Sequence, residues 1–443
     1  MNEKILKELF EYLSIPSISK LQSKGSCSLE FENGVCKFLK SKLDSIGFST
    51  RIITEKYFDP IIYSQYKRDK NKFNLLVYCH TDVQPVEPIS EWKTDPFSPK
   101  IKNGKIYARG ISDSKGQLFS FISAVEQVIQ EQKELPINIT FVIDCDEEAE
   151  QRSLPHLIKN KPELFKCDAI LISAGSMVKN NTPSICCGYR GIVSAEIELT
   201  TFKQNLHSGS FGGGALNAAE CLAKLLSKIK DENNKIKIKG FYDNVREEVI
   251  GTAGVWYKIK DFLKLIGARK ISCEKDYDLN HCLCLRPTFE INGMHSGSSE
   301  DFFQYIVPST AKAKVSFRLV CNQDPKVIFA RFKDFINKNK QNGTKVDIRL
   351  VDKAYPTIIS QDTDFIRKIE KSFDNLFKND IVKYYEGGCV PIVYDFLKFT
   401  DQIYMVGFGS PDDNIHGPNE KLNVKDFFKG IRFYKNLIKE LEK

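Results

Sequence analysis

The chain has 443 residues, 42% of them hydrophobic and 28% charged, and these values exclude a disordered or fibrous protein and favour two or three packed domains. Lys and Arg exceed Asp and Glu by 65 to 57, but the basic stretches at 67–72 and 235–239 have no aromatic residues between their charges, so we expect no nucleic-acid partner. No apolar run approaches the roughly 18 residues that cross a bilayer, so we expect no membrane partner either.

The first 17 residues, MNEKILKELFEYLSIPS, predict an amphipathic helix because apolar residues recur with the helical period. Acidic residues occur throughout this segment, which is unlike a signal peptide. The 13 cysteines are odd in number and scattered, many of them in apolar runs, and they form no C-x-x-C pair. Together these features predict a cytoplasmic protein.

Short apolar runs then alternate with helical periods up to about residue 190, a pattern typical of an α/β layer architecture. The runs at 73–79, 137–144 and 168–173 predict buried strands, and a helix is expected from about residue 116. The last helix should begin after Asn423, which is a good N-cap residue.

The middle of the chain follows a different order. Its predicted elements are a strand at 192–200, a helix at 214–230, strands at 286–292 and 312–320, a helix at 325–339 and a strand at 345–351. This β-α-β-β-α-β order is ferredoxin-like. We therefore expect an α+β domain at 192–355 inserted into a catalytic domain made of 1–191 and 356–443, while the polar insertion at 231–284 stays unassigned.

Polar residues gather where the predicted elements of the catalytic domain end. These are His80, Asp82, Asp113, Glu147, Glu148 and His416. Each alone is more often a capping or surface residue, but in an open α/β sheet ligands bind at the strand ends. Imidazoles and carboxylates together form a ligand set suited to zinc. A shared carboxylate can hold two such ions roughly 3.5–4 Å apart.

Motifs in this order, "HTD", "RGISDSKG", "DEE", "NLHSGSFGG", "RPTFEING", "SFRLVCNQDP", "EGGCVPI" and "PDDNIHGPNEKL", carry a resemblance that spans about residues 75–425. The chain resembles the co-catalytic zinc exopeptidases and deacylases, which include carnosinases, glutamate carboxypeptidases, acetylornithine deacetylase and aminoacylases. The dipeptidase branch is the most similar. The resemblance implies a catalytic domain with a central mixed sheet and an inserted dimerisation domain.

The resemblance also implies roles for the polar residues. His80 would bind one zinc ion, Asp113 would bridge, and Glu148 with His416 would hold the second ion, for which manganese or cobalt could substitute. Asp82 would fix the tautomer of His80. Glu147 would be the general base toward a water whose pKa a metal lowers to roughly 7.

Three further residues match the family in the inserted domain and the "EGGCVPI" loop. His207 would reach across a homodimer and stabilise the oxyanion in the partner's site, with a solvent-exposed loop histidine as the alternative. Arg318 would bind the terminal carboxylate of the substrate, with a structural ion pair as the alternative. Gly388 would lie in the substrate-binding loop.

Ala174 is the main departure, because it occupies the place of an aspartate that the family uses as a zinc ligand. A methyl group has no lone pair, so the site at His80 would keep only Asp113 as its second protein ligand, with water or Ser176 completing the set. We expect one firmly held ion and one weak or absent ion. Ala174 could be engineered, natural in a one-metal enzyme, or a sign of lost hydrolysis.

The pocket departs too: Tyr305 replaces a substrate-contacting threonine, Asp352 lies near the place of a histidine that helps polarise the carbonyl, and Cys389 replaces a serine. The leading hypothesis is a zinc-dependent hydrolase that cleaves the amide of a dipeptide or short peptide with a free carboxylate. The alternatives are a deacylase of N-acyl amino acids and a catalytically silent dimer that binds such ligands.

Overall fold

The computed structural model describes residues 2–19, 31–66, 69–149, 151–245, 257–298 and 302–442, so parts of the basic stretch at 67–72 and of the insertion at 231–284 lie outside the described residues. The chain forms two compact units. The first unit comprises Met1–Cys187, Ile359–Tyr384 and Asp395–Lys443, and the second comprises Gly188–Ile358 and Tyr385–Tyr394. Residues 385–394, which we had placed in the catalytic domain, thus group with the inserted one.

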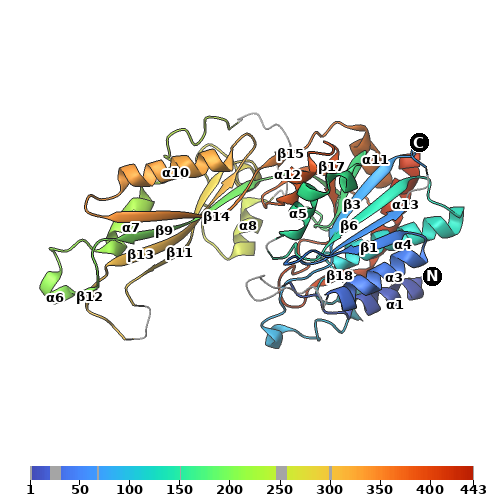
Figure 1. The fold of residues 1–443 in the computed structure, drawn as a ribbon, viewed down its shortest axis with the longest axis horizontal. Helices are drawn as coiled ribbons and strands as arrows, with labels where there is room; N and C mark the ends of the chain where they lie inside the picture. The colour runs from blue at the N-terminus through green and yellow to red at the C-terminus, as the bar shows by residue number, and fades with distance from the viewer. Residues whose placement is uncertain are drawn as a thin grey trace. The chain divides into compact units, whose positions relative to one another are not determined.

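The first unit is built on a mixed sheet (Figure 1). Its strands lie in the order β1 (Ser49–Ile53), β2 (Ile61–Tyr66), β6 (Asn138–Asp144), β3 (Asn74–His80), β7 (Ala169–Ser173), β17 (Ile403–Val406) and β8 (Ser184–Tyr189), and β16 (Val382–Glu386) also pairs with β8. β3 runs parallel to both β6 and β7, whereas β2 is antiparallel to β6. The three buried strands predicted from the sequence are β3, β6 and β7, so the expected mixed α/β fold is confirmed.

Helices pack against this sheet. They are α1 (Asn2–Leu13), α3 (Lys37–Ser45), α4 (Lys115–Gln132), α5 (Ser153–Asn160), α11 (Asp364–Ser372) and α13 (Val424–Glu442), while the short α12 (Ile392–Phe396) is divided between the two units. The two longest pack on each other, with the rings of Phe121 on α4 and Tyr434 on α13 stacked 4.2 Å apart. A small separate sheet is formed by β4 (Lys100–Lys102), β5 (Lys105–Tyr107) and β18 (Lys421–Asn423), with β5 in the middle.

Three neighbouring strands of the first unit end next to candidate site residues. β3 ends at His80, β6 ends at Asp144 just before the two glutamates, and β7 ends at Ser173 just before Ala174. Because these strands are parallel, their carboxyl ends meet at one edge of the sheet.

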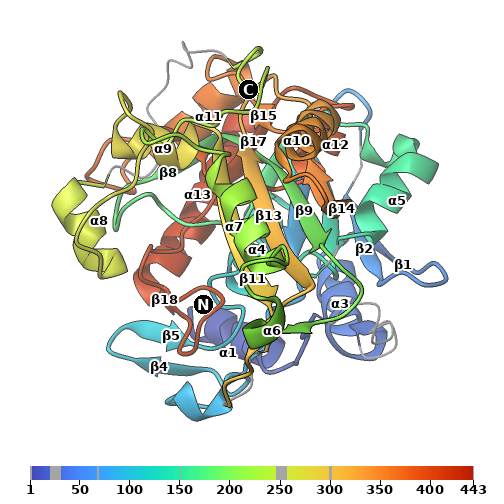
Figure 2. The ribbon, with the colours of Figure 1, turned by 90° about the vertical axis from the view of Figure 1, so that its left-hand side faces the viewer.

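The second unit contains an antiparallel sheet in the order β11 (Thr288–Ser296), β13 (Thr310–Leu319), β9 (Gly191–Thr200) and β14 (Lys345–Ala354). Helices α7 (Ala218–Ser227) and α10 (Pro325–Asn339) cover one face, where alternate strand residues form an apolar core (Figure 2). This is the ferredoxin-like order expected from the sequence. Its remaining elements are β10 (Leu206–His207), α6 (Ser208–Phe211), α8 (Ile259–Ile266), α9 (Leu279–Cys284), β12 (Ile306–Val307) and β15 (Thr357–Ile358).

Within the described residues, we find no helix whose length and apolar character would let it cross a membrane. Each described cysteine is a free thiol.

Candidate metal centre and substrate-binding residues

His80 is buried at the end of β3, with an exposed fraction of 4%. Its Nδ1 lies 3.0 Å from the backbone oxygen of Asp82 and 3.6 Å from the carboxylate Oδ1 of the same residue. We expected the carboxylate to orient this ring, but the backbone carbonyl is the nearer acceptor. With Nδ1 facing these oxygens, the other ring nitrogen, Nε2, faces Asp113 Oδ1 at 3.1 Å.

The carboxylate of Asp82 connects two loops. Its Oδ2 accepts hydrogen bonds from the hydroxyl of Ser19 at 2.7 Å and from the backbone N–H of Glu148 at 2.9 Å. Its Oδ1 is buried and has no hydrogen-bond partner among the described residues. Asp82 therefore positions the loop of Glu148 as well as facing the ring of His80.

Asp113 stands two residues before α4 and presents its two oxygens to different imidazoles. Oδ1 lies 3.1 Å from Nε2 of His80, and Oδ2 lies 3.1 Å from Nε2 of His416. Burial alone would raise the pKa of Asp113, but the hydrogen bonds to His416 and His80 outweigh it and hold that pKa below its usual value. A carboxylate with one oxygen on each side has the geometry of a bridging ligand.

Glu148 and His416 meet on one side of Asp113, with Glu148 Oε2 3.2 Å from His416 Nε2. The same glutamate oxygen accepts a hydrogen bond from Gln84 at 2.8 Å. The Glu148 side chain is only 5% exposed, whereas the His416 side chain is 53% exposed. Hydrogen bonds to Asp113 and Glu148 raise the pKa of His416 to about 10.

Glu147 is partly buried next to this cluster, and its carboxylate makes no hydrogen bond or ion pair with any described residue. Burial raises the pKa of Glu147 to about 7, with the charge of His80 acting in the opposite direction. A carboxylate with free lone pairs and a pKa near neutrality is suited to accept a proton.

These side chains fit a divalent metal ion. His80, Asp113 and Glu148 each offer a ligand atom, and the three atoms lie within 4.8 Å of one another. The neighbouring ligand atoms are 3.1–3.2 Å apart, close to the ~3.3 Å that separates tetrahedral ligands about 2.0 Å from a zinc ion. The backbone carbonyl of Asp82, 3.0 Å from His80 Nδ1, is the acceptor that the second ring nitrogen of a metal-bound imidazole needs, and the Oδ1 of the same residue lies 3.6 Å from that nitrogen.

Ala174 directly follows β7, in a loop that packs closely against its neighbours. The side-chain amide of Gln117 donates to the carbonyl of Gly175 at 2.8 Å, and a Cβ at Gly407 would lie only 2.5 Å from the carbonyl of Ala174. The hydroxyl of Ser176 lies close to Gly409, where an added Cβ would be 2.9 Å away. Ser176 is thus turned toward Gly409, and no carboxylate stands at this strand end.

Glu420 supports the loop of the candidate site, and sequence reasoning missed it. Its buried carboxylate accepts backbone N–H groups from Gly110 at 2.8 Å, Ser112 at 2.9 Å and Asp113 at 3.1 Å. The guanidinium of Arg109 pairs with the same carboxylate at 2.9 Å. Glu420 therefore holds the loop that carries Asp113. The motif "PDDNIHGPNEKL" contains Glu420, but only His416 in that motif is predicted from the sequence to bind a metal.

A second group of predicted site residues lies in the second unit. The guanidinium of Arg318, at the end of β13, makes no hydrogen bond or ion pair with any described residue. The loop of Gly388 is held by Arg190, whose backbone N–H donates to the carbonyls of Glu386 and Gly388 and whose Nε donates to Gly387 at 2.8 Å. Arg190, another residue missed from the sequence, ties residues 386–388 to this unit.

His207 lies in the two-stranded sheet of β10 and β12, exposed to solvent. Four large aromatic side chains near β10 and β12 are exposed. They are Phe211, Phe302, Phe303 and Tyr305, with exposed fractions of 51%, 63%, 79% and 69%. The backbone N–H of Ser208 donates to the carbonyl of Tyr305, so the histidine and the aromatic segment share one small structure.

Comparison with known proteins agrees with this picture. The model of peptidase family M20/M25/M40 matches residues 76–440. The β-Ala-His dipeptidase of Rattus norvegicus is 27% identical over 87% of this chain and 80% of its own length. The Cys-Gly metallodipeptidase of Schizosaccharomyces pombe is 27% identical over 99% of this chain and 96% of its own.

Among solved structures, an M20 family metallo-carboxypeptidase from Sulfolobus solfataricus superposes with a TM-score of 0.85 at 28% identity, covering 99% of both chains.

Proposed function

The chain belongs to the M20/M25/M40 peptidase family and is a metallopeptidase, and on that premise we propose that it is a dipeptidase that hydrolyses short peptides with a free terminal carboxylate. The observation that carries the proposal is the convergence of His80, Asp113, Glu148 and His416. The names of its dipeptidase relatives support the same substrate class.

We assign the metal, zinc by ligand chemistry, to these four residues. Asp113 would be shared between two ions, Glu148 and His416 would complete the ligands of one, and His80 would be the remaining ligand of the other. When bound, the metal supplies a water whose pKa is lowered to roughly 7 and polarises the amide carbonyl. Because Ala174 offers no ligand, the side of His80 binds an ion weakly or not at all.

Glu147 is the general base of the proposed reaction. It takes a proton from the attacking water and delivers it to the leaving amine, for which a pKa near neutrality is favourable in both directions. Asp82 holds the backbone N–H of Glu148 and faces His80, so it positions a metal ligand on each side.

Arg318 supplies recognition of the substrate's carboxylate. Its guanidinium has no described partner, and a free planar fork is well shaped for two parallel hydrogen bonds to a carboxylate. Gly388 offers backbone in the loop that Arg190 fixes.

His207 acts in the site of a second copy of the chain. The exposed aromatic residues beside it support a homodimer, because such side chains are enriched where proteins associate. The free thiols of the described cysteines fit the reducing cytoplasm that we propose as its location.

The first experiment is an activity panel with the purified protein, loaded with zinc, manganese or cobalt. We expect hydrolysis of dipeptides and little activity on N-acetyl amino acids. Cleavage confined to N-acyl substrates would favour the deacylase instead. No turnover of any substrate with any metal would leave the silent ligand-binding dimer.

The dimer has its own test. We expect a dimer by light scattering, and we expect the separate His207→Ala and Glu147→Gln proteins to be nearly inactive. Mixed dimers carry one complete site, so mixing the two variants should restore activity toward about a quarter of the wild-type value. A monomer, or no recovery on mixing, would contradict a role for His207 in the partner's site.

A further inference from the structure

The four-stranded sheet of the second unit leaves one face open. On β9 and β13 the residues toward α7 and α10 form the apolar core, so the alternate residues point to the open face. These include Ser194, Glu196 and Glu198 on β9 and Lys312, Lys314, Ser316 and Arg318 on β13.

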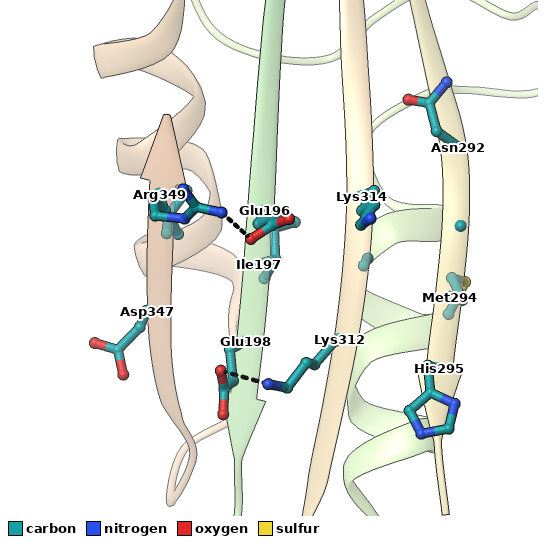
Figure 3. Close-up of a pocket in the computed structure, with 13 residues that line it drawn as sticks. Glu196, Ile197, Glu198, Asn292, Met294, His295, Lys312, Lys314, Asp347 and Arg349 are labelled. Carbon is teal, nitrogen blue, oxygen red and sulfur yellow. Dashed lines mark hydrogen bonds and ion pairs between the residues drawn. The ribbon is translucent and has the colours of Figure 1, made fainter. Parts of the chain in front are cut away.

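The two glutamates in the middle of this face are paired. Glu196 binds Arg349 at 2.6 Å and Glu198 binds Lys312 at 3.1 Å (Figure 3). They line a shallow hollow of about 830 Å³. Because these carboxylates already have cationic partners, they are poor candidates to bind a charged ligand.

Arg318 and Asp352 lie at the end of the same face and are different. Strand register sets Arg318 opposite Ile192, while a bulge after Leu350 sets Asp352 opposite Ser194. Directly opposite residues share a face, so Asp352 points to the open side like Ser194.

Neither charge is paired. In the part of the chain that the structure describes, neither residue forms an ion pair, and the Asp352 carboxylate accepts only the N–H of Lys353 at 2.7 Å. The two flank β9, so strand spacing and rise place their Cα atoms about 12 Å apart. Both charges act on the thiol of Cys389: burial raises its pKa to about 12, Arg318 opposes that rise and Asp352 adds to it.

We propose that Asp352 is a specificity-determining residue that selects dipeptides whose C-terminal residue carries a cationic side chain. The inference rests on the proposed function, because it takes Arg318 as the group that binds the terminal carboxylate. A C-terminal lysine or arginine has a carboxylate at one end and a cation on a long flexible stem at the other. The carboxylate of such a residue complements Arg318, and its cationic side chain complements Asp352.

Other C-terminal residues match this surface less well. A neutral side chain gives Asp352 no partner, and an acidic one places a second negative charge beside it, which is unfavourable. The expected ranking at the C-terminal position is therefore cationic, then neutral, then acidic.

The test compares kcat/KM for dipeptides with one common N-terminal residue and Lys, Arg, Leu or Glu at the C-terminus. Wild-type protein should prefer Lys over Leu by about tenfold, the worth of one charge-assisted hydrogen bond. Asp352→Asn should remove this ratio mainly through KM, and Asp352→Lys should move the preference toward Glu. The wild-type ratio should shrink at high salt, because a partly exposed charge pair is screened.

Asp347→Asn is the matched control, since Asp347 is an exposed acid on the same strand and lines the hollow. It should keep the wild-type Lys:Leu ratio. An Asp352→Asn protein that keeps the ratio, or a wild type without it, overturns the proposal.

Calorimetric binding of free L-lysine and L-leucine separates this inference from the proposed function. Wild-type protein should bind lysine more tightly than leucine, and Asp352→Asn should lose the difference, whether or not the protein turns over dipeptides. Equal binding of the two amino acids by wild-type protein contradicts the role of Asp352. Absence of dipeptide hydrolysis with the binding difference intact contradicts only the dipeptidase.

Discussion

The two sides of Asp113 differ in what they offer a metal ion. On one side Asp113, Glu148 and His416 bring three ligand atoms together at 3.1 and 3.2 Å, although the His416 side chain is 53% exposed. On the other side His80 is almost fully buried, but Ala174 contributes no ligand. The number of converging lone pairs, and not burial, therefore decides which side should hold its ion.

Removing the shared ligand should have the largest effect, because it breaks both sides at once. We expect Asp113→Ala to lose bound metal and at least about 100-fold in kcat/KM, beyond the 10–100-fold typical of an outer partner of a metal ligand. Metal analysis after dialysis and steady-state kinetics measure the two effects, and unfolding temperature controls for misfolding. Full metal content in this variant would mean that Asp113 is not a ligand.

Variants that remove one histidine at a time should show which side of Asp113 binds metal more tightly. His416→Ala removes a ligand from the complete side and should lower metal content and activity strongly, whereas His80→Ala acts on the incomplete side and should cost less. The measurement is zinc affinity from competition with a chelating dye. A larger loss for His80→Ala than for His416→Ala would reverse our assignment of the stronger side.

Glu420→Gln should have an intermediate effect on both sides. The amide keeps the size of the carboxylate but loses the charge that binds Arg109 and three backbone N–H groups, so the loop of Asp113 becomes less well positioned. We expect zinc affinity to fall about 10–100-fold. Unchanged affinity alongside a lowered unfolding temperature would show that Glu420 stabilises the fold without positioning the site.

Ala174→Asp should add the missing ligand on the weaker side, the side of His80. The hydrogen bond from Gln117 to the carbonyl of the neighbouring Gly175 holds this loop, so we expect it to keep its position when the carboxylate is added. We expect metal content to rise from about one to about two ions per chain. If the variant binds no more metal than the parent, Ala174 does not lie in the metal site.

The smallest expected effect concerns the pH dependence of kcat/KM. Glu147 acts as a base only when ionised, and its raised pKa of about 7 means that kcat/KM falls as pH drops through that value. Bound metal adds positive charge and moves this acid limb to lower pH. Ala174→Asp should move it lower still if a second ion binds, and a limb unaffected by metal would exclude Glu147 as the group that titrates.

Much of this arrangement could be read from the sequence, because it depends on strand ends. His80 and the two glutamates follow predicted parallel strands, and parallel strands bring their carboxyl ends to one edge. The metal roles of these residues stay predictions, although the structure places them together.

The supporting contacts could not be read in this way. Glu420 binds backbone amides near Asp113, and Arg190 binds backbone carbonyls near Gly388. Backbone groups have no side-chain identity, so such contacts leave no residue pattern in the sequence. For the same reason the grouping of residues 385–394 with the second unit could not be predicted, since part of this segment is held there by hydrogen bonds between its backbone and Arg190.

Glu420 has one more consequence, for the order of events during protein synthesis. A ribosome synthesises the Asp113 loop long before Glu420, whose carboxylate accepts hydrogen bonds from the amides of that loop. Glu420 comes 307 residues after Asp113, just before β18 and α13. A nascent chain can pair β3 with β6 while its metal centre is still unformed. On the proposed assignment, the nascent chain therefore completes its metal centre only after residue 420 has been synthesised.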